Sequence, residues 1–251
     1  GYGGSQSKSN HKVLHTDTVD MVGDEALLYV ERFPTWVGGD RVKSARLAQN
    51  AGADILLMDD GFQNHGLEKD LSFLVVDRKV GFGNGRVLPA GPLREPIAAA
   101  FQRTQHLVLM GDEKQPLPQD MPTSAVVYAA RLDLVDEDLI WLKGKDLIAF
   151  SGIGRPDKFF ESLHHAGANV LEARPFADHH VFTASELQSL LDLQSSLGDT
   201  HGETTIVTTS KDHKRLPSAV KNQVRKISVN LVSKDEQRIL QAVLSVPKLR
   251  S

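Results

Sequence analysis

The stretch Ala53-Asp-Ile-Leu-Leu-Met-Asp-Asp-Gly-Phe-Gln63 decides the fold class that the sequence predicts. Residues 54–58 form a short, mainly apolar run, which is typical of a strand buried inside a parallel sheet. Two acids, Asp59 and Asp60, follow at once, and ligands of open parallel sheets bind outside the carboxyl ends of the strands. An acid at such a strand end is how nucleoside triphosphatases hold magnesium, directly or through water. The alternative is a solvated turn, because Asp-Asp-Gly is also favourable turn sequence.

The composition is that of an ordinary globular protein. The chain has 251 residues, enough for one large domain or two small ones, with 40% hydrophobic and 24% charged residues. Its net charge of −3, from 29 basic and 32 acidic residues, gives no electrostatic argument for nucleic acid as a partner. Cysteine is absent, which excludes disulfides and thiol chemistry. The first methionine is Met21, so we expect a chain truncated before Gly1.

Strands and helices are expected to alternate at short spacing, which is typical of α/β proteins. Strands are expected at residues 35–37, 54–58, 71–77, 107–110, 125–131, 146–152, 169–172, 205–209 and 224–229. Helices are expected at residues 26–32 and 40–50, from residues 156 and 210 onward, at 184–193 and at 234–244, with 133–142 a linker or short helix. Thr183 and Glu186 have the spacing of a capping box.

Three loop or cap regions carry candidate functional residues. Asp24 and Glu25 open the first helix, where acids are also stabilised simply by the free amides and the helix dipole. The Gly- and Pro-dense residues 81–96 predict a held loop, in which Arg94 is able to reach an anion or is merely solvated. Asp178 and His179 precede a helix start, and a histidine there acts as acid or base near neutral pH or is a plain loop residue.

Eight short motifs occur in one order along nearly the whole chain. They are Gly1-Tyr-Gly-Gly, Gly23-Asp-Glu, Asp59-Asp-Gly-Phe-Gln, Phe82-Gly-Asn-Gly, Leu88-Pro-Ala-Gly-Pro-Leu-Arg-Glu, Gly152-Ile-Gly-Arg-Pro, Phe176-Ala-Asp-His and Thr209-Ser-Lys-Asp. Each motif is weak by itself, but their joint order is specific. Together they resemble the tetraacyldisaccharide 4'-kinases, the lipid A 4'-kinases of Gram-negative bacteria.

The resemblance implies phosphoryl transfer from ATP, with Mg²⁺, to the 4'-hydroxyl of a lipid A disaccharide 1-phosphate. It also implies an α/β fold in which a P-loop NTPase-like parallel sheet domain, incomplete here, joins a second α/β domain across a substrate cleft. We expect residues 1–78 to be the remainder of the P-loop domain, 79–233 the second domain, and 234–251 a terminal helix that packs back on the first. A monomer at the cytoplasmic face of the inner membrane is expected, with that membrane surface as a partner.

The resemblance also assigns roles to individual residues. It implies that Asp24 is the catalytic base and that His179 is its partner, which tunes the pKa of the base and takes up the proton. Glu25, Asp59 and Asp60 correspond to the family's magnesium-associated acids, whose hard oxygens suit that ion. Gln63, Arg94 and Asp178 match positions that line the cleft and bind substrate or phosphate, and the planar fork of Arg94 suits phosphate.

The chain departs from the family pattern at three places. Asn64-His65-Gly66 stands where the family commonly has His-Tyr-Arg, and Ser210 stands where it commonly has an acid. A Gly-x-x-x-x-Gly-Lys-Thr loop is not present in residues 1–251, and in the family it lies upstream of the Gly1-Tyr-Gly-Gly motif. Two alternatives therefore stay open: a kinase-like chain that binds lipid or nucleotide without activity, and a generic magnesium-dependent P-loop phosphotransferase.

Residues 1–251 expressed alone are expected to show negligible kinase turnover. The P-loop supplies the amides that cradle the phosphates, a lysine that reaches them and a hydroxyl on magnesium, and the other glycine-rich run, residues 81–85, lacks that ending. The measurement is phosphorylation of the lipid disaccharide by residues 1–251 with magnesium ATP. Turnover near that of a chain that carries an upstream P-loop would refute the expectation.

Overall fold

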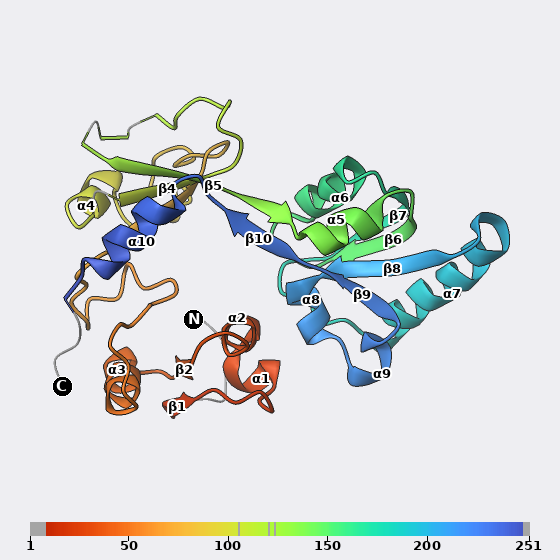
Figure 1. The fold of residues 1–251 in the computed structure, drawn as a ribbon, viewed down its shortest axis with the longest axis horizontal. Helices are drawn as coiled ribbons and strands as arrows, with labels where there is room; N and C mark the ends of the chain where they lie inside the picture. The colour runs from red at the N-terminus through yellow and green to blue at the C-terminus, as the bar shows by residue number, and fades with distance from the viewer. Residues whose placement is uncertain (1–8, 105, 120, 123, 248–251) are drawn as a thin grey trace. The chain divides into compact units, whose positions relative to one another are not determined.

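The computed structural model describes residues 9–104, 106–119, 121–122 and 124–247 (Figure 1). The Gly1-Tyr-Gly-Gly motif lies outside these described residues. The chain divides into two compact units, the first made of Gly1–Asp40 with Leu134–Val229 and the second of Arg41–Asp133 with Asn230–Ser251. This division differs from the boundaries expected after residues 78 and 233, because each unit combines an early and a late segment.

The first unit is built on a four-stranded parallel sheet with strand order β7-β6-β8-β9. Its strands are β6 (Asp146–Ser151), β7 (Asn169–Pro175), β8 (Thr204–Thr209) and β9 (Val224–Ile227). Leu147 to Phe150 in β6 are all fully buried. Such a continuous apolar run is what a central strand covered on both faces requires, and it confirms the strand expected at residues 146–152.

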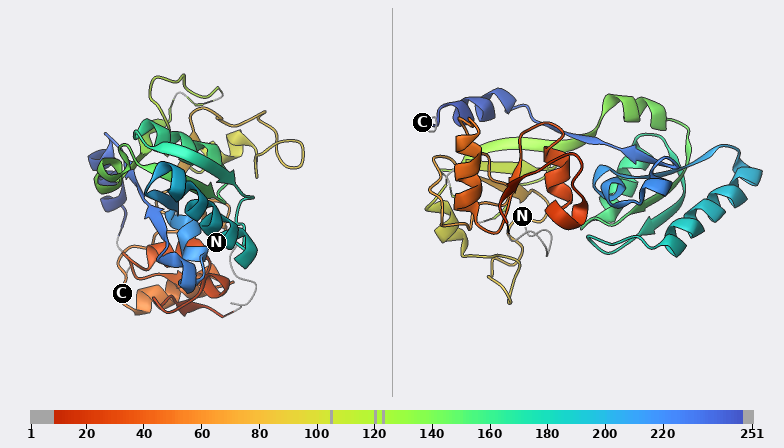
Figure 2. Two further views of the ribbon diagram at one scale, coloured as in Figure 1. Left: turned by 90° about the vertical axis from the view of Figure 1, so that its right-hand side faces the viewer. Right: turned by 90° about the horizontal axis from the view of Figure 1, so that it is seen from below.

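Helices cover both faces of this sheet, as the two views in Figure 2 allow the reader to follow. One face packs against α6 (Pro156–His165), through Phe159, Phe160 and Leu163, and against Leu142 of α5 (Asp136–Leu142). The other face packs against α7 (Ala184–His201), whose N-terminus carries the expected capping box between Thr183 and Glu186. Two short helices, α8 (Ser210–Arg215) and α9 (Ser218–Lys221), connect β8 to β9.

The N-terminal part of the first unit forms a small separate cluster. The strands β1 (His11–Lys12) and β2 (Trp36–Val37) pair antiparallel, and between them lie α1 (Val19–Val22) and α2 (Asp24–Tyr29). Buried side chains of both helices and of the preceding loop form its core, namely Val13, Val22, Ala26 and Leu27. Helix α2 also contacts α8, so the acids at the start of α2 lie beside the turn that ends β8.

The second unit has a parallel sheet of its own. Strands β3 (Phe73–Asp77), β4 (His106–Met110) and β5 (Val126–Leu134) run parallel, and β10 (Val229–Val232) is hydrogen-bonded to β5. One face packs against Phe101 of α4 (Ile97–Phe101), and the other against Ile239 of α10 (Glu236–Leu244). Helix α3 (Arg41–Asn50) completes the unit. None of the helices in the described residues has the length and apolar character needed to cross a membrane.

The structure contradicts the expected buried strand at residues 54–58. This segment is irregular and ends in a turn at Asp59 and Asp60, and the side chain of Leu57 is 77% exposed. A buried parallel strand needs hydrogen-bonded neighbours, and the described part of the chain places no strand beside this segment. The local geometry of Asp59 and Asp60 is therefore that of the solvated turn. The wider prediction of an α/β fold with parallel sheets is confirmed.

Replacing Ile148 by alanine should lower the free energy of unfolding by about 2–5 kcal/mol, because it leaves a cavity in the centre of the first sheet. The matched control is Ile140→Ala, since Ile140 on α5 is 71% exposed and should change stability by less than about 0.5 kcal/mol. Chemical denaturation of both variants measures the difference. Equal effects would show that the interior of this sheet is not packed as described.

Candidate functional site

A buried carboxylate joins two strand ends of the first unit. Asp212, in the first turn of α8, is fully buried and accepts hydrogen bonds from Ser151 Oγ (2.9 Å), from the amide of Gly152 (3.1 Å) and from Thr209 Oγ1 (2.7 Å). Thr209 caps α8 and accepts in turn from the amide of Asp212. These bonds tie the C-terminal end of β6 to the β8–α8 turn, which is where a parallel sheet presents its ligand-binding edge.

The loop that carries His179 lies directly over Gly152. The amide of His179 donates to the carbonyl of Gly152 at 3.0 Å. A Cβ at Gly152 would lie 3.1 Å from the carbonyl oxygen of Ala177 and 3.2 Å from Cβ of His180, so a larger residue would have to push the loop away by a few tenths of an ångström. His179 has φ of 59°, and among the described non-glycine residues only Asp60 shares a positive φ. Such backbone conformations concentrate at functional sites.

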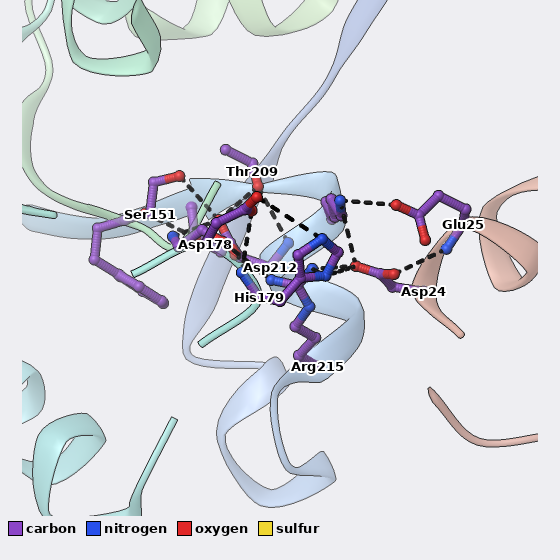
Figure 3. A network of polar contacts seen from close by, with 12 residues as sticks. Asp24, Glu25, Ser151, Asp178, His179, Thr209, Asp212 and Arg215 are labelled. Carbon is purple, nitrogen blue, oxygen red and sulfur yellow. Dashed lines mark hydrogen bonds and ion pairs between the residues drawn. The ribbon is translucent and has the colours of Figure 1, made fainter. Parts of the chain in front are cut away.

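Arg215 connects this turn to the first helices of the chain (Figure 3). Its side chain is 6% exposed and lies one turn after Asp212 on α8. One terminal nitrogen, Nη1, donates to Asp212 Oδ1 and to the carbonyl of Gly152, both at 3.2 Å. The other, Nη2, donates to Asp24 Oδ2 and lies 3.0 Å from His179 Nδ1. The guanidinium therefore bridges β6, α8, α2 and the histidine loop.

Asp24 is the centre of a cluster of charged groups. Its buried carboxylate lies 3.7 Å from Lys211 Nζ and 3.8 Å from His179 Nδ1, in addition to the contact with Arg215. Burial alone would raise the pKa of Asp24, but hydrogen bonds from Glu25 and Arg215 and the charges of Arg215 and Lys211 outweigh it and hold this pKa at about 2. Asp24 is therefore ionised at neutral pH.

Glu25 and Asp178 flank this cluster on two sides. Glu25 forms an ion pair with Lys211 at 2.8 Å, and Asp178 Oδ2 lies 3.8 Å from His179 Nε2 with its side chain half exposed. Four of the residues singled out from sequence, Asp24, Glu25, Asp178 and His179, thus lie together in the first unit, although they come from two segments far apart in the sequence. The arrangement offers an ionised carboxylate and an imidazole beside an open edge, which is suited to proton transfer.

The other four singled-out residues, Asp59, Asp60, Gln63 and Arg94, all belong to the second unit. Nη1 of Arg94 donates to both carboxylate oxygens of Asp60, at 2.8 and 2.9 Å. Gln63 Nε2 donates to Glu95 at 2.9 Å, which links Gln63 to the same loop as Arg94. Asp59 is exposed in the adjacent turn.

Hydrogen bonds within the loop that contains Arg94 fix its conformation, as its prolines and glycines predict. The amide of Leu88 donates to the carbonyl of Leu93, and Asn84 Nδ2 donates to the carbonyl of Ala90 at 2.9 Å. A Cβ at Gly91 would overlap Asn84 Oδ1 at 2.1 Å and the carbonyl oxygen of Arg86 at 2.3 Å. This close approach explains why a glycine occupies the middle of the loop.

Within the ranges that the structure describes, no group of three or more Asp, Glu, His or Cys side chains is arranged to hold a metal. Two of the three acids predicted to bind magnesium form ion pairs with cations, Glu25 with Lys211 and Asp60 with Arg94. A protein site for Mg²⁺ commonly supplies only one or two carboxylates, with waters and nucleotide phosphates as the other ligands. Glu25 alone, or Asp59 with Asp60, fits that donor set.

Sequence reasoning assigned no role to Lys211, Asp212 or Arg215. A signal for two of them was present, because Thr209 and Asp212 have the spacing of a helix cap, and Arg215 follows one helical turn later on the same face. Nothing local indicates that Arg215 contacts Asp24, since 191 positions separate them in the chain.

Comparison with known proteins confirms the resemblance read from the motifs. A sequence model of the family described as Tetraacyldisaccharide-1-P 4'-kinase matches residues 1–247. The tetraacyldisaccharide 4'-kinase of Gluconobacter oxydans is 44% identical over 248 residues, which cover 98% of this chain and 74% of that protein. The enzyme of the same name from Rhodospirillum centenum is 44% identical over 231 residues, covering 91% of this chain and 67% of that protein.

A solved structure supports the same assignment. The chain is similar to LpxK from Aquifex aeolicus, crystallised in complex with ATP, with a TM-score of 0.71 and 26% sequence identity. The match covers 95% of this chain and 75% of the crystallised one. The order of the motifs, the parallel-sheet fold and these relatives agree, and the chain belongs to the tetraacyldisaccharide 4'-kinase family.

Proposed function

We propose that this protein transfers a phosphoryl group from ATP to the 4'-hydroxyl of a tetraacyldisaccharide 1-phosphate in lipid A biosynthesis. The family to which the chain belongs supports the reaction. The main structural support for this chemistry is the position of His179 beside Asp24 at the C-terminal edge of the first sheet, where Asp24 Oδ2 and His179 Nδ1 are 3.8 Å apart. A hydroxyl that attacks a phosphoryl group must lose its proton, and this pair provides groups that accept one.

In this proposal Asp24 accepts the hydroxyl proton and His179 takes it up afterwards. Asp24 is ionised, as a base must be, but a carboxylate with a pKa of about 2 retains a proton poorly. The His179 imidazole beside it offers a ring nitrogen that is able to take up the proton next. The two residues therefore act as a unit, in which Asp24 orients the hydroxyl and His179 stores the proton on Nδ1, in exchange for the contact of that nitrogen with Arg215 Nη2.

The second unit supplies candidate contacts to phosphate. Arg94 presents a guanidinium on a held loop, and Gln63 lies in the same polar network. We propose that Arg94 binds a phosphate of ATP or of the lipid, in exchange for part of its ion pair with Asp60, because its planar fork suits such oxygens. Gln63, and Asp178 in the first unit, are proposed to bind substrate hydroxyl groups.

We further propose magnesium as the metal cofactor. Either Glu25 of the first unit or the pair Asp59 and Asp60 of the second unit would hold it, together with water and phosphate oxygens. Bound there, the ion would neutralise charge on the phosphates of ATP. Lys211, which pairs with Glu25 at 2.8 Å, would then be released to face a phosphate.

The place of action follows from the substrate. An acylated disaccharide resides in a membrane, so we propose that the protein works as a monomer at the cytoplasmic face of the inner membrane of a Gram-negative bacterium. The family's lipid substrate supports work at a membrane surface, whereas the monomer and the cytoplasmic face stay predictions.

Asp24→Ala and His179→Ala should each lower kcat by about 100-fold or more in the full-length gene product, because each removes a member of the proton-accepting pair. The double variant should be little worse than the poorer single variant, since residues that act as a unit are not additive. Steady-state kinetics with the lipid disaccharide and magnesium ATP measure all three. Fully additive losses would contradict the pair.

Asp24 should also make stability depend on pH. Its pKa is about 2 in the folded protein against 3.8 ordinarily, so it contributes stability above pH 3.8, which is lost as the pH falls through about 2. The contribution is about 2 kcal/mol at neutral pH and falls by roughly half at pH 3. The free energy of unfolding of the wild type and of Asp24→Asn measures it between pH 7 and pH 3. Asp20→Asn is the control, because Asp20 is exposed on α1. The free energies of unfolding of the wild type and of Asp24→Asn should approach each other as the pH falls toward 3. If their difference stays constant, Asp24 does not have the low pKa given above.

A further inference from the structure

We propose that Arg215 is a positioning residue, which holds the His179 ring beside Asp24 and fixes it as the neutral tautomer with its proton on Nε2. The contacts that carry this inference are within the first unit and concern the protein without substrate. The expected effect of Arg215 on kcat rests on the function proposed above, whereas its expected effect on the tautomer of His179 does not.

The arrangement of donors and acceptors determines the tautomer. Asp24 Oδ2 and His179 Nδ1 are 3.8 Å apart, which is too far for a hydrogen bond. Nη2 of Arg215 contacts both atoms and lies 3.0 Å from Nδ1. A guanidinium has N–H donors and no acceptor, so Nδ1 must present its lone pair. The ring proton is therefore on Nε2, the nitrogen that lies toward Asp178.

Arg215 is itself fixed on its other side. Nη1 donates to Asp212 and to the carbonyl of Gly152, and Asp212 is held by Ser151, Thr209 and the amide of Gly152. Rotating the guanidinium away from His179 would break these bonds inside a buried site, where unpaired polar groups are costly. The fork of an arginine makes contacts on both sides at once, and the single ammonium of a lysine cannot.

The other charged groups around the pair cannot replace this function. Lys211 lies 3.7 Å from Asp24 and is also paired with Glu25, and no contact between Lys211 and His179 is among those described. Asp178 faces Nε2 at 3.8 Å and favours a proton on that nitrogen, but it does not orient the ring relative to Asp24. Arg215 alone among these contacts Asp24 and His179 together.

The direct test is ¹⁵N NMR of the imidazole in the full-length gene product without substrate. The His179 signals are assigned by their absence in His179→Asn, and the wild type should show Nδ1 unprotonated and Nε2 protonated. Arg215→Met and Arg215→Lys should shift His179 toward a mixture of tautomers. Arg225→Met is the matched control, because Arg225 also pairs with a buried acid of this unit, Asp138, away from the histidine. It should leave the His179 signals unchanged.

Kinetics provide the second readout. Arg215→Lys should lower kcat by about 10- to 100-fold, with both KM values within about two-fold, because the pair is misplaced while the binding groups remain. Guanidinium added to Arg215→Ala should restore part of the lost kcat, and an equal concentration of sodium chloride should not. If Arg215→Met does not fold, Arg215→Lys carries both measurements.

The outcomes separate this inference from the proposed function. If His179 keeps the wild-type tautomer in both Arg215 variants, the positioning role of Arg215 is wrong. It is also wrong if the Arg215 variants lose no more kcat than Arg225→Met. If Asp24→Ala and His179→Ala keep full turnover while the Arg215 variants change the tautomer, the proposed catalytic pair is wrong and the positioning role stands.

Discussion

The hydrogen bonds accepted by the Asp212 carboxylate are the interaction on which the site depends. A fully buried carboxylate is tolerated only when its oxygens are satisfied, and here a hydroxyl from each of two strand ends, a backbone amide and a guanidinium do so. Ser151 is the last residue of β6, Gly152 follows it, and Thr209 is the last residue of β8. The same carboxylate therefore fixes the geometry of the sheet edge and the position of Arg215.

The charges around Asp24 reflect two opposed requirements. Two cations and a backbone amide keep its carboxylate ionised in a buried position, which a base needs before it accepts a proton. The same groups make it a weak base, because every interaction that favours the ionised form lowers the affinity for a proton. A neutral imidazole next to the carboxylate relieves this conflict, since the proton does not have to remain on Asp24.

The sequence predicted best those features that short-range physics controls. The buried run in β6 and the capping box between Thr183 and Glu186 depend on residues close in the chain, and both were found. Asp24 was expected at or near the N-cap of its helix, and it lies directly after the N-cap residue. The segment 54–58 was misjudged because an apolar run becomes a strand only beside a partner strand. Arg215 was missed because a buried arginine and an exposed one look the same in a sequence.

The discontinuous make-up of the first unit has a consequence for biosynthesis. Asp24 leaves the ribosome among the first residues of this sequence, whereas Arg215 and Asp212 follow almost two hundred positions later. Until then the N-terminal helices lack the partner element α8, and the carboxylate of Asp24 lacks its counterions. The first unit therefore cannot finish folding until its late segment has been synthesised, although its N-terminal residues are made early. A nascent chain that ends before residue 215 therefore holds Asp24 without the guanidinium that contacts it in the folded unit.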